Sequence, residues 1–176
     1  MQENKSNIVL IGMPGSGKST VGVILAKMLA RDFIDTDVLI QVSQGRPLQE
    51  IVDTEGYLTL RGIEEKALLT LNCINHVIAT GGSAVYSEKA MIHLKSDGIL
   101  VFLDVNLHNL LSRVYDYATR GLAKPSEQSF ADLFEERIEL YRKFADITVK
   151  GSGLKQEEVC EEIIRVLSSD QDKKIS

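Results

Sequence analysis

Near its N-terminus the chain reads Asn7-Ile-Val-Leu-Ile-Gly-Met-Pro-Gly-Ser-Gly-Lys-Ser19, a short apolar run that leads into a glycine-rich turn. The apolar run, residues 7–11, is rich in β-branched side chains and predicts a strand buried on both faces. After the turn, residues 20–30 carry apolar side chains at helical spacing. A strand, a glycine turn and a helix in this order open a βαβ unit, which predicts an α/β fold.

Further apolar runs of strand length follow along the chain. We expect strands at residues 33–34, 76–80, 98–103 and 147–149, and helices within 38–73, 106–115, 130–144 and 156–167. Strands that alternate with helices predict a mostly parallel sheet of five strands with helices on both faces, a three-layer sandwich. We also expect a single domain over residues 1–176, a mobile loop within 116–129 and a frayed C-terminus.

The composition argues against several classes of partner. With 176 residues, 44% of them hydrophobic, the chain can bury one sizeable core. Its formal net charge of -5 argues against a nucleic-acid partner, which calls for a basic surface. The N-terminus is polar and no apolar run reaches bilayer length, so we expect neither a signal peptide nor a membrane partner. Cys73 and Cys160 have no metal or redox spacing, which favours a reduced, cytoplasmic protein.

The turn after the first strand fits the phosphate-binding pattern G-x-x-x-x-G-K-[ST] at every fixed position. Glycines let successive backbone N–H groups point at phosphate oxygens, and the helix N-terminus adds a partial positive charge. Lys18 would reach the β- and γ-phosphates of ATP, and the Ser19 hydroxyl would ligate Mg²⁺. The residues predicted to bind the nucleotide are Gly12, Gly15, Ser16, Gly17, Lys18, Ser19 and Thr20.

A phosphate loop indicates a nucleotide but leaves the reaction open. GTPases also carry an N-K-x-D element that reads guanine, and the chain has none. The stretch Asp53-Thr-Glu-Gly56 fits the D-x-x-G switch pattern of GTPases, but it follows a helical stretch instead of a buried strand. We therefore interpret it as a chance match.

Two carboxylates, Asp35 and Asp37, follow the second strand, at the sheet edge where such folds bind ligands. If the backbone stays extended, both side chains face the same side, whereas a turn lets them diverge. One could hold Mg²⁺ through water while the other accepts a proton from a substrate hydroxyl. The alternative is structural: Asp37 would cap the helix that begins at Val38, and Asp35 would be solvated.

Further motifs follow the phosphate loop in a fixed order. They are Asp35-Thr-Asp37, Leu60-Arg-Gly-Ile-Glu64, Thr80-Gly-Gly82, Arg120, and Arg137 with Leu140-Tyr-Arg142. This ordered set resembles the shikimate kinase family, with similar spacing over residues 7–167. The resemblance implies a P-loop NTPase fold with a helical acceptor-binding region at about 37–65 and a lid at about 115–128. It implies an enzyme that transfers the γ-phosphate of ATP, with Mg²⁺, to the 3-hydroxyl of shikimate in aromatic amino-acid biosynthesis.

On the nucleotide side, the resemblance implies that Asp35 and Ser19 hold Mg²⁺ and that Arg113 stacks on adenine. Lys18, Asp37 and Arg120 would be the catalytic residues, with Arg120 reaching the transferring phosphoryl group from the lid. Without the resemblance, Arg113 reads as a solvated charge on a charge-rich helix, and so does Arg137.

On the acceptor side, the resemblance implies that Asp37 binds the acceptor hydroxyls and assists deprotonation. Arg61 and Arg137 would clamp the acceptor carboxylate, since a planar guanidinium can meet a carboxylate bidentately. Glu64, three residues after Arg61, could orient that guanidinium. The residues implied to bind the acceptor are Asp37, Arg61, Gly81, Gly82, Ser83 and Arg137, the two glycines through backbone N–H groups.

The departures from the family pattern fall on the acceptor side. Ser83 stands where the family has a third glycine, and Gly121 stands where the lid has a proline; Leu60 and Tyr57 replace an aromatic and an acidic residue. Ser83 places a Cβ and a hydroxyl where the family leaves bare backbone. On that packing argument we expect Ser83→Gly to raise the turnover of shikimate.

Two alternative functions stay open on the sequence. A related kinase could use another hydroxy acid or sugar acid, such as gluconate, and its ATP turnover would not respond to shikimate. A regulatory protein that has lost transfer activity would bind ATP without acceptor-dependent ADP release. In the kinase readings the partner is a small-molecule acceptor, and we expect a monomer.

Overall fold

A computed structural model describes residues 6–113 and 121–172 of the chain. Five strands form one sheet in the order β2-β3-β1-β4-β5, and every neighbouring pair is parallel. The strands are β1 (Asn7–Ile11), β2 (Asp32–Asp35), β3 (His76–Ala79), β4 (Gly98–Asp104) and β5 (Ile147–Lys150). The predicted five-stranded parallel sheet is therefore confirmed.

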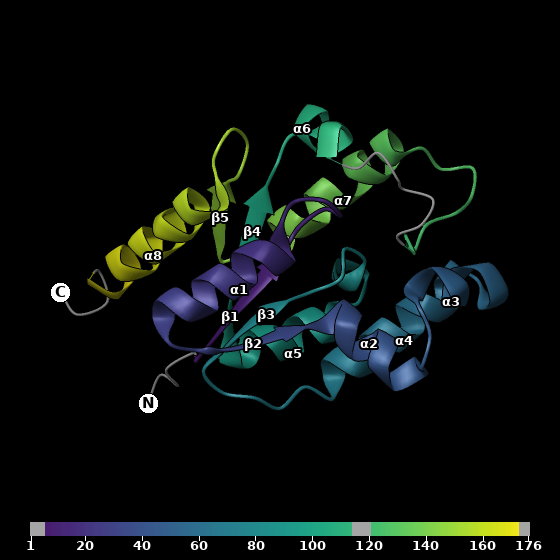
Figure 1. Cartoon of the computed structure of the whole chain (residues 1–176), viewed down its shortest axis with the longest axis horizontal. Coiled ribbons are helices and arrows are strands. Elements are labelled where there is room, and N and C mark those ends of the chain that lie inside the picture. The colour runs from purple at the N-terminus through teal and green to yellow at the C-terminus, as the bar shows by residue number, and fades with distance from the viewer. Residues whose placement is uncertain (1–5, 114–120, 173–176) are drawn as a thin grey trace.

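Helices cover both faces of this sheet, as Figure 1 shows. The helices are α1 (Lys18–Leu29), α2 (Thr36–Gln44), α3 (Leu48–Glu55), α4 (Tyr57–Leu69), the 3-10 turn η1 (Ala84–Tyr86), α5 (Glu88–Asp97), α6 (Leu107–Arg113), α7 (Phe130–Phe144) and α8 (Gln156–Asp172). One core layer joins the sheet to α1 and α8, and the other joins it to α4, α5 and α7. The three-layer arrangement expected from the sequence is present.

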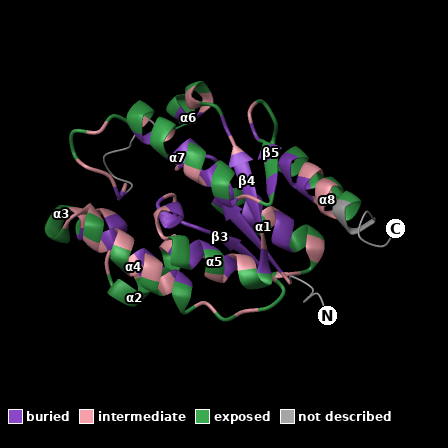
Figure 2. Ribbon diagram, turned by 180° about the vertical axis from the view of Figure 1, so that it is seen from behind, coloured by how far each residue is buried: buried purple, intermediate pink, exposed green. Residues whose placement is uncertain are grey.

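The central strand shows why both layers form. All five residues of β1 are buried. Ile8 and Leu10 pack in the layer of α1 and α8, whereas Val9 and Ile11 pack in the opposite layer, because successive strand residues point to opposite faces. Figure 2 shows the central strands buried along their length, while the outer faces of the helices are exposed.

The main differences from the expected elements concern α5 and α8. Helix α5 was not predicted, because its buried residues are few, namely Ala90, Met91 and Leu94, and charged residues surround them. Helix α8 continues to Asp172 instead of ending near residue 167, since no glycine or proline follows to stop it. Within residues 6–113 and 121–172, no helix combines the length and the apolar character that crossing a bilayer requires.

Helices α2 and α3, together with the first turns of α4, form a lobe beyond the edge of the sheet, while the end of α4 packs in the main core. Its small core contains Ile40, Leu48, Ile51 and Leu60, and Ala123 from the segment before α7 completes it. This lobe matters for the site because α4 carries Arg61 and Glu64. The segment around Ala123 therefore packs against the lobe that carries these two side chains.

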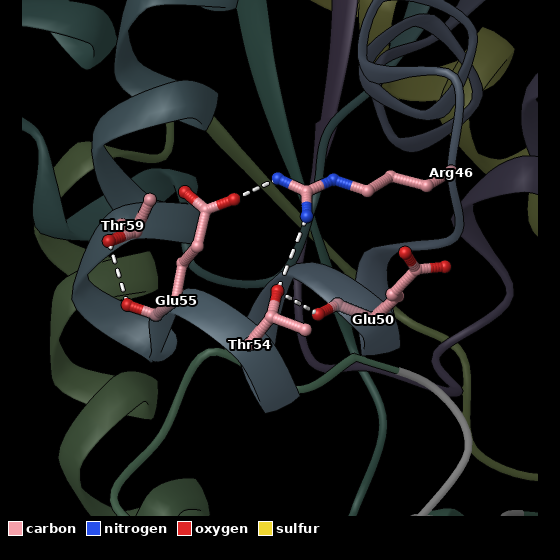
Figure 3. A network of polar contacts seen from close by, with 5 residues as sticks. All are labelled: Arg46, Glu50, Thr54, Glu55 and Thr59. Atoms are coloured by element: carbon pink, nitrogen blue, oxygen red, sulfur yellow. Dashed lines mark hydrogen bonds and ion pairs between the residues drawn. The ribbon is translucent and has the colours of Figure 1, made fainter.

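The turns between these helices are held by polar contacts (Figure 3). Arg46, in the turn between α2 and α3, forms an ion pair with Glu55 and donates to Thr54 Oγ1 at 3.2 Å. The Thr59 hydroxyl in α4 donates to the Glu55 carbonyl at 2.9 Å and so links α3 to α4. Since these groups are partly exposed, each contact adds little stability, and together they link the three helices.

A capping box fixes the start of α7, the helix that carries Arg137. Ser129 Oγ accepts from the Asp132 N–H at 3.0 Å, and the Asp132 carboxylate accepts from the Ser129 N–H at 3.1 Å. We predict that Ser129→Ala lowers the free energy of unfolding by about 1 kcal/mol, since the Asp132 N–H at the helix start loses its side-chain acceptor. Urea unfolding measures this change. Ser168→Ala, in the exposed part of α8, is the control and should shift the midpoint little; equal shifts would contradict the prediction.

Candidate active site

The phosphate loop has the backbone that its glycines were expected to allow. Gly12, Gly15 and Gly17 have φ angles of 148°, 81° and 94°, which side-chain-bearing residues rarely adopt. Gly17 is the N-cap residue of α1, so the loop ends at a helix N-terminus. The loop therefore offers backbone N–H groups and the positive end of a helix dipole to an anion.

Lys18 lies at the centre of this loop and is only 8% exposed. Its ammonium donates to the carbonyls of Gly12 and Met13 at 2.8 and 2.9 Å. Burial lowers the pKa of Lys18 to about 8, although Asp37 and Asp35 oppose this effect. A nucleotide phosphate in the loop would supply the negative charge that stabilises the protonated form.

The two carboxylates after β2 have separate roles, because the helix begins between them. Asp35 is the N-cap residue of α2, and its Oδ1 accepts from the Asp37 N–H at 3.0 Å and from the Val38 N–H at 3.3 Å. The alternative in which Asp37 caps the helix is therefore wrong. Asp37 lies in the first turn, and its side chain lines the cavity beside Lys18. Burial raises the pKa of Asp37 in spite of the nearby ammonium.

The two residues after Thr80 must be glycines because charged side chains of the site pack directly against their backbone. A side-chain carbon on Gly81 would collide with Glu64 Oε1 and lie 2.7 Å from Asp37 Oδ1. A side-chain carbon on Gly82 would lie 2.9 Å from Arg137 Nη1. The Gly81 N–H donates to Thr36 Oγ1 at 3.1 Å, so this amide is already used. The sequence predicted that the N–H groups of Gly81 and Gly82 both face the acceptor. Because Thr36 takes the N–H of Gly81, only the N–H of Gly82 stays a candidate.

Arg137 is the most unusual charge in the site, because it is 1% exposed. Its Nε donates to Tyr86 Oη at 3.3 Å and its Nη2 donates to the Ala123 carbonyl at 3.1 Å. Within the described residues it forms no ion pair with a carboxylate. A buried cation without a counter-ion is costly, so this guanidinium is poised to receive an anion.

Arg61 converges on the same place from α4. Its Nε and Nη2 donate to the Ala123 carbonyl at 3.2 and 2.9 Å, the same oxygen that Arg137 contacts. The guanidinium stacks on the Tyr86 ring at 3.6 Å from its centroid, with Tyr57 at 5.1 Å. Two guanidinium groups thus meet at one carbonyl oxygen, which is a geometry suited to a carboxylate.

Glu64 does not orient Arg61 as the sequence suggested. Its Oε2 accepts a hydrogen bond from the Ser83 hydroxyl, and Arg61 uses the Ala123 carbonyl and the tyrosine rings. The residue that departs from the family pattern, Ser83, therefore holds Glu64. Burial and the nearby Asp37 raise the pKa of Glu64 to about 7.

One cavity of about 530 Å³ joins most of these groups. Most of the predicted site residues line it: Gly15, Gly17, Lys18, Ser19, Thr20, Asp37, Gly81, Gly82, Ser83, Arg113 and Arg137. Ser16 is buried in the loop, and Asp35 caps α2. Arg61 lines a second pocket together with Tyr86, and Glu64 and Ser83 line both pockets. Arg120 lies outside the described residues, as does the lid segment 115–120.

Sequence reasoning missed three residues that organise this site. Tyr86 stacks on Arg61 and accepts from Arg137, Thr36 holds the Gly81 amide, and the Ala123 carbonyl gathers both arginines. No motif marks Tyr86 or Ala123, because their contacts come from segments far apart in the chain. Thr36 stands between two motif carboxylates and was passed over.

Comparison with known proteins agrees with this arrangement. The family model described as shikimate kinase matches residues 14–168. The chain belongs to the shikimate kinase family. The shikimate kinase of Caldanaerobacter subterraneus subsp. tengcongensis is 37% identical over 162 residues, covering 90% of this chain and 94% of that protein. The family consists of ATP-dependent kinases, and the chain is an ATP-dependent kinase of this family.

Solved structures of shikimate kinases have the same fold. The enzyme of Acinetobacter baumannii in complex with shikimate superposes with a TM-score of 0.88 at 33% identity and covers 96% of each chain. The enzyme of Aquifex aeolicus gives a TM-score of 0.81 at 37% identity, covering 94% of this chain and 98% of that one. The expected P-loop kinase fold is confirmed over nearly the whole chain.

The lowered pKa of Lys18 predicts that nucleotide affinity depends on pH. Below pH 8 the ammonium of the free protein is charged and binds phosphate; above it, binding requires proton uptake. We expect the Kd of a non-hydrolysable MgATP analogue to rise by up to roughly fivefold between pH 8 and pH 9, since the ammonium is already half deprotonated at pH 8. Calorimetric titration at several pH values measures this. Lys18→Arg stays charged and should show a flat profile over this range, so parallel profiles would refute the assignment.

Proposed function

We propose that the protein transfers the γ-phosphate of ATP to the 3-hydroxyl group of shikimate, with Mg²⁺. The observation that carries this proposal is the pair of guanidinium groups that meet at the Ala123 carbonyl, next to Asp37 and the phosphate loop. The similar enzyme of Acinetobacter baumannii is described in complex with shikimate, a carboxylate that bears hydroxyl groups.

The arginine pair supports a carboxylate-bearing acceptor. Arg137 and Arg61 are positive charges that share a neutral carbonyl oxygen. A carboxylate at this point would bring a full negative charge and two acceptor oxygens, and charge-assisted hydrogen bonds are about twice as strong as neutral ones. The acceptor would therefore take the place of the Ala123 carbonyl, or share the arginines with it.

Asp37 and Lys18 support phosphoryl transfer at the other end of the cavity. Asp37 faces the buried ammonium of Lys18 and lines the space between the phosphate loop and the arginines. Its raised pKa fits a group that takes a proton from an acceptor hydroxyl. Lys18 would stabilise negative charge on the β- and γ-phosphates as the bond to ATP breaks.

The residues present fit Mg²⁺ bound together with ATP. The described residues contain no cluster of three His, Cys, Asp or Glu side chains that would hold a metal by themselves. Mg²⁺ ordinarily takes one or two protein ligands and completes its shell with phosphate oxygens and water. Ser19, in the first turn of α1, and Asp35, through the oxygen that does not cap α2, would be those ligands.

The remaining expectations extend this proposal. Arg120 and a lid at about 115–128 would close over ATP and exclude water, and Arg113 would stack on adenine. Residues 37–65 would form the acceptor-binding region of a single domain over 1–176. The enzyme would act as a monomer in the cytoplasm, without nucleic-acid or membrane partners.

The direct test is ADP release by the purified protein with MgATP, with and without millimolar shikimate. We expect strong stimulation by shikimate and none by gluconate, with the product phosphorylated at the 3-position by ³¹P and ¹H NMR. Stimulation by gluconate or another sugar acid alone would favour a related kinase. ATP binding without any stimulated release would favour the regulatory alternative, and either result would overturn the proposal.

Arg137→Lys tests the carboxylate clamp. It keeps a positive charge but loses the planar fork, so we expect the KM for shikimate to rise at least tenfold, roughly the cost of one charge-assisted hydrogen bond. The KM for ATP should change little. Arg142→Lys, on the same helix but exposed and paired with Glu139, is the matched control and should leave both values near wild type. Equal changes in the two KM values of Arg137→Lys would argue against the clamp.

A further inference from the structure

A glutamate outside the main cavity is connected to the arginine pair through one tyrosine. Glu136 precedes Arg137 on α7, and its side chain is exposed. Its Oε1 accepts from the Tyr86 hydroxyl at 2.5 Å, and Tyr86 Oη in turn accepts from Arg137 Nε at 3.3 Å. Within the residues that the structure describes, Glu136 and Arg137 form no direct ion pair. The tyrosine hydroxyl therefore stands between a carboxylate and a buried guanidinium.

The charges at the two ends fix the direction of these hydrogen bonds. A guanidinium can only donate and an ionised carboxylate can only accept, so the Tyr86 hydroxyl gives its proton to Glu136 and its lone pair to Arg137. The contact with Tyr86 lowers the pKa of Glu136, while burial and this same contact raise the pKa of Tyr86. Hydrogen bonds in series polarise one another, so the carboxylate makes the tyrosine oxygen a stronger acceptor for the arginine.

A second contact holds the carboxylate of Glu136 in place. Gln128 Nε2 donates to Glu136 Oε2 at 2.7 Å, which leaves Oε1 for Tyr86. The Gln128 carbonyl accepts from Lys124 Nζ at 2.8 Å, in the segment whose Ala123 carbonyl binds both arginines. The segment 123–128 therefore contacts the arginine pair at one end and the glutamate at the other.

The ring of Tyr86 acts on the other arginine of the pair. Arg61 Cζ lies 3.6 Å from the centroid of this ring. A ring that stacks on a guanidinium covers its face and leaves the N–H groups in its plane free for an anion. Arg137 is contacted at its edge instead, through Nε, so its Nη2 donates to the Ala123 carbonyl and its Nη1 packs against Gly82. One side chain thus orients both guanidinium groups without using their terminal nitrogens.

We infer that Tyr86 and Glu136 are positioning residues that orient the arginine pair for the acceptor carboxylate. Tyr86 sets the orientation of both guanidinium groups, by its ring on Arg61 and by its hydroxyl on Arg137. Glu136 supplies, through that hydroxyl, the negative charge that Arg137 does not receive from a direct ion pair. This inference rests on the proposed function and adds two residues to it, neither of which touches the reacting atoms.

Tyr86→Phe and Glu136→Gln test this role by their effect on the acceptor. Tyr86→Phe keeps the ring but removes the partner of Arg137 Nε, so we expect the KM for shikimate to rise about tenfold, as for a lost hydrogen bond to a charged group. Glu136→Gln should raise it about threefold, since an exposed carboxylate acts more weakly. The KM for ATP and kcat should change less than about twofold in both variants. Glu135→Gln, its exposed neighbour on α7, is the matched control and should leave all three values near wild type.

The methyl ester of shikimate separates positioning from a general effect on the structure. The ester has no negative charge for the arginines to bind, so kcat/KM of Tyr86→Phe and of the wild type should differ less than about twofold with this substrate. Tyr86→Leu also removes the ring and should raise the KM for shikimate about threefold further. Equal losses of Tyr86→Phe on the acid and on the ester would overturn the positioning role, and equal KM values for Tyr86→Phe and Tyr86→Leu would overturn the role of the ring.

A double-mutant cycle tests whether Glu136 acts through Tyr86. In the Tyr86→Phe background, Glu136→Gln should hardly change the KM for shikimate, because the hydroxyl that connects the two charges is already absent. Additive losses would overturn the role of Glu136 through Tyr86. A wild type that does not phosphorylate shikimate would overturn the proposed function and this inference with it, so the assay of the wild type alone distinguishes the two failures.

Discussion

The site depends on one buried charge, the guanidinium of Arg137. It is 1% exposed and has no carboxylate partner among the described residues, so the surrounding structure has to satisfy it through neutral oxygens. Tyr86 and the Ala123 carbonyl do so, and a glycine at position 82 leaves room for the guanidinium. The carbonyl of that glycine accepts from Tyr141 at 2.7 Å, which fixes the backbone next to the charge.

This arrangement links distant parts of the chain. Ala123 packs into the core of the α2–α4 lobe while its carbonyl binds arginines from both α4 and α7. Gly121 also contacts the lobe: its N–H donates to Gln49 Oε1 at 2.7 Å, and its lack of a side chain allows close approach to Leu48. An acceptor carboxylate that competes for the arginines would therefore act directly on the segment around Ala123.

Much of the fold could be predicted from the sequence because its signals are local. The phosphate loop, the five strands and α7 each follow from a short motif or a clear apolar pattern. Helix α5 was missed because only a few of its residues are buried. The nucleotide side of the site was predicted for the same reason, since its residues are neighbours in the sequence.

The acceptor side could be predicted only in part, because it is assembled from distant segments. Arg137 read as a solvated charge on its own helix, although it stands between Leu133 and Tyr141 on the buried stripe of α7, and that spacing was a usable signal. Which of Asp35 and Asp37 caps the helix depends on the residue at which α2 begins. Sequence patterns predict helix boundaries only to within one or two residues. The hydrogen-bond partner of Glu64 is Ser83, which comes from a different segment of the chain, so sequence spacing could not predict it.

The central claim is that the pair formed by the buried Arg137 and the half-buried Arg61 is reserved for the carboxylate of the acceptor. Calorimetric titration of the protein with shikimate and with its methyl ester, both in the presence of a non-hydrolysable MgATP analogue, tests this most directly. The ester keeps every hydroxyl group but has no negative charge. The account predicts that the ester binds at least about 100-fold more weakly, as expected when two charge-assisted contacts to a buried cation are lost. Equal affinities for the acid and the ester would contradict it.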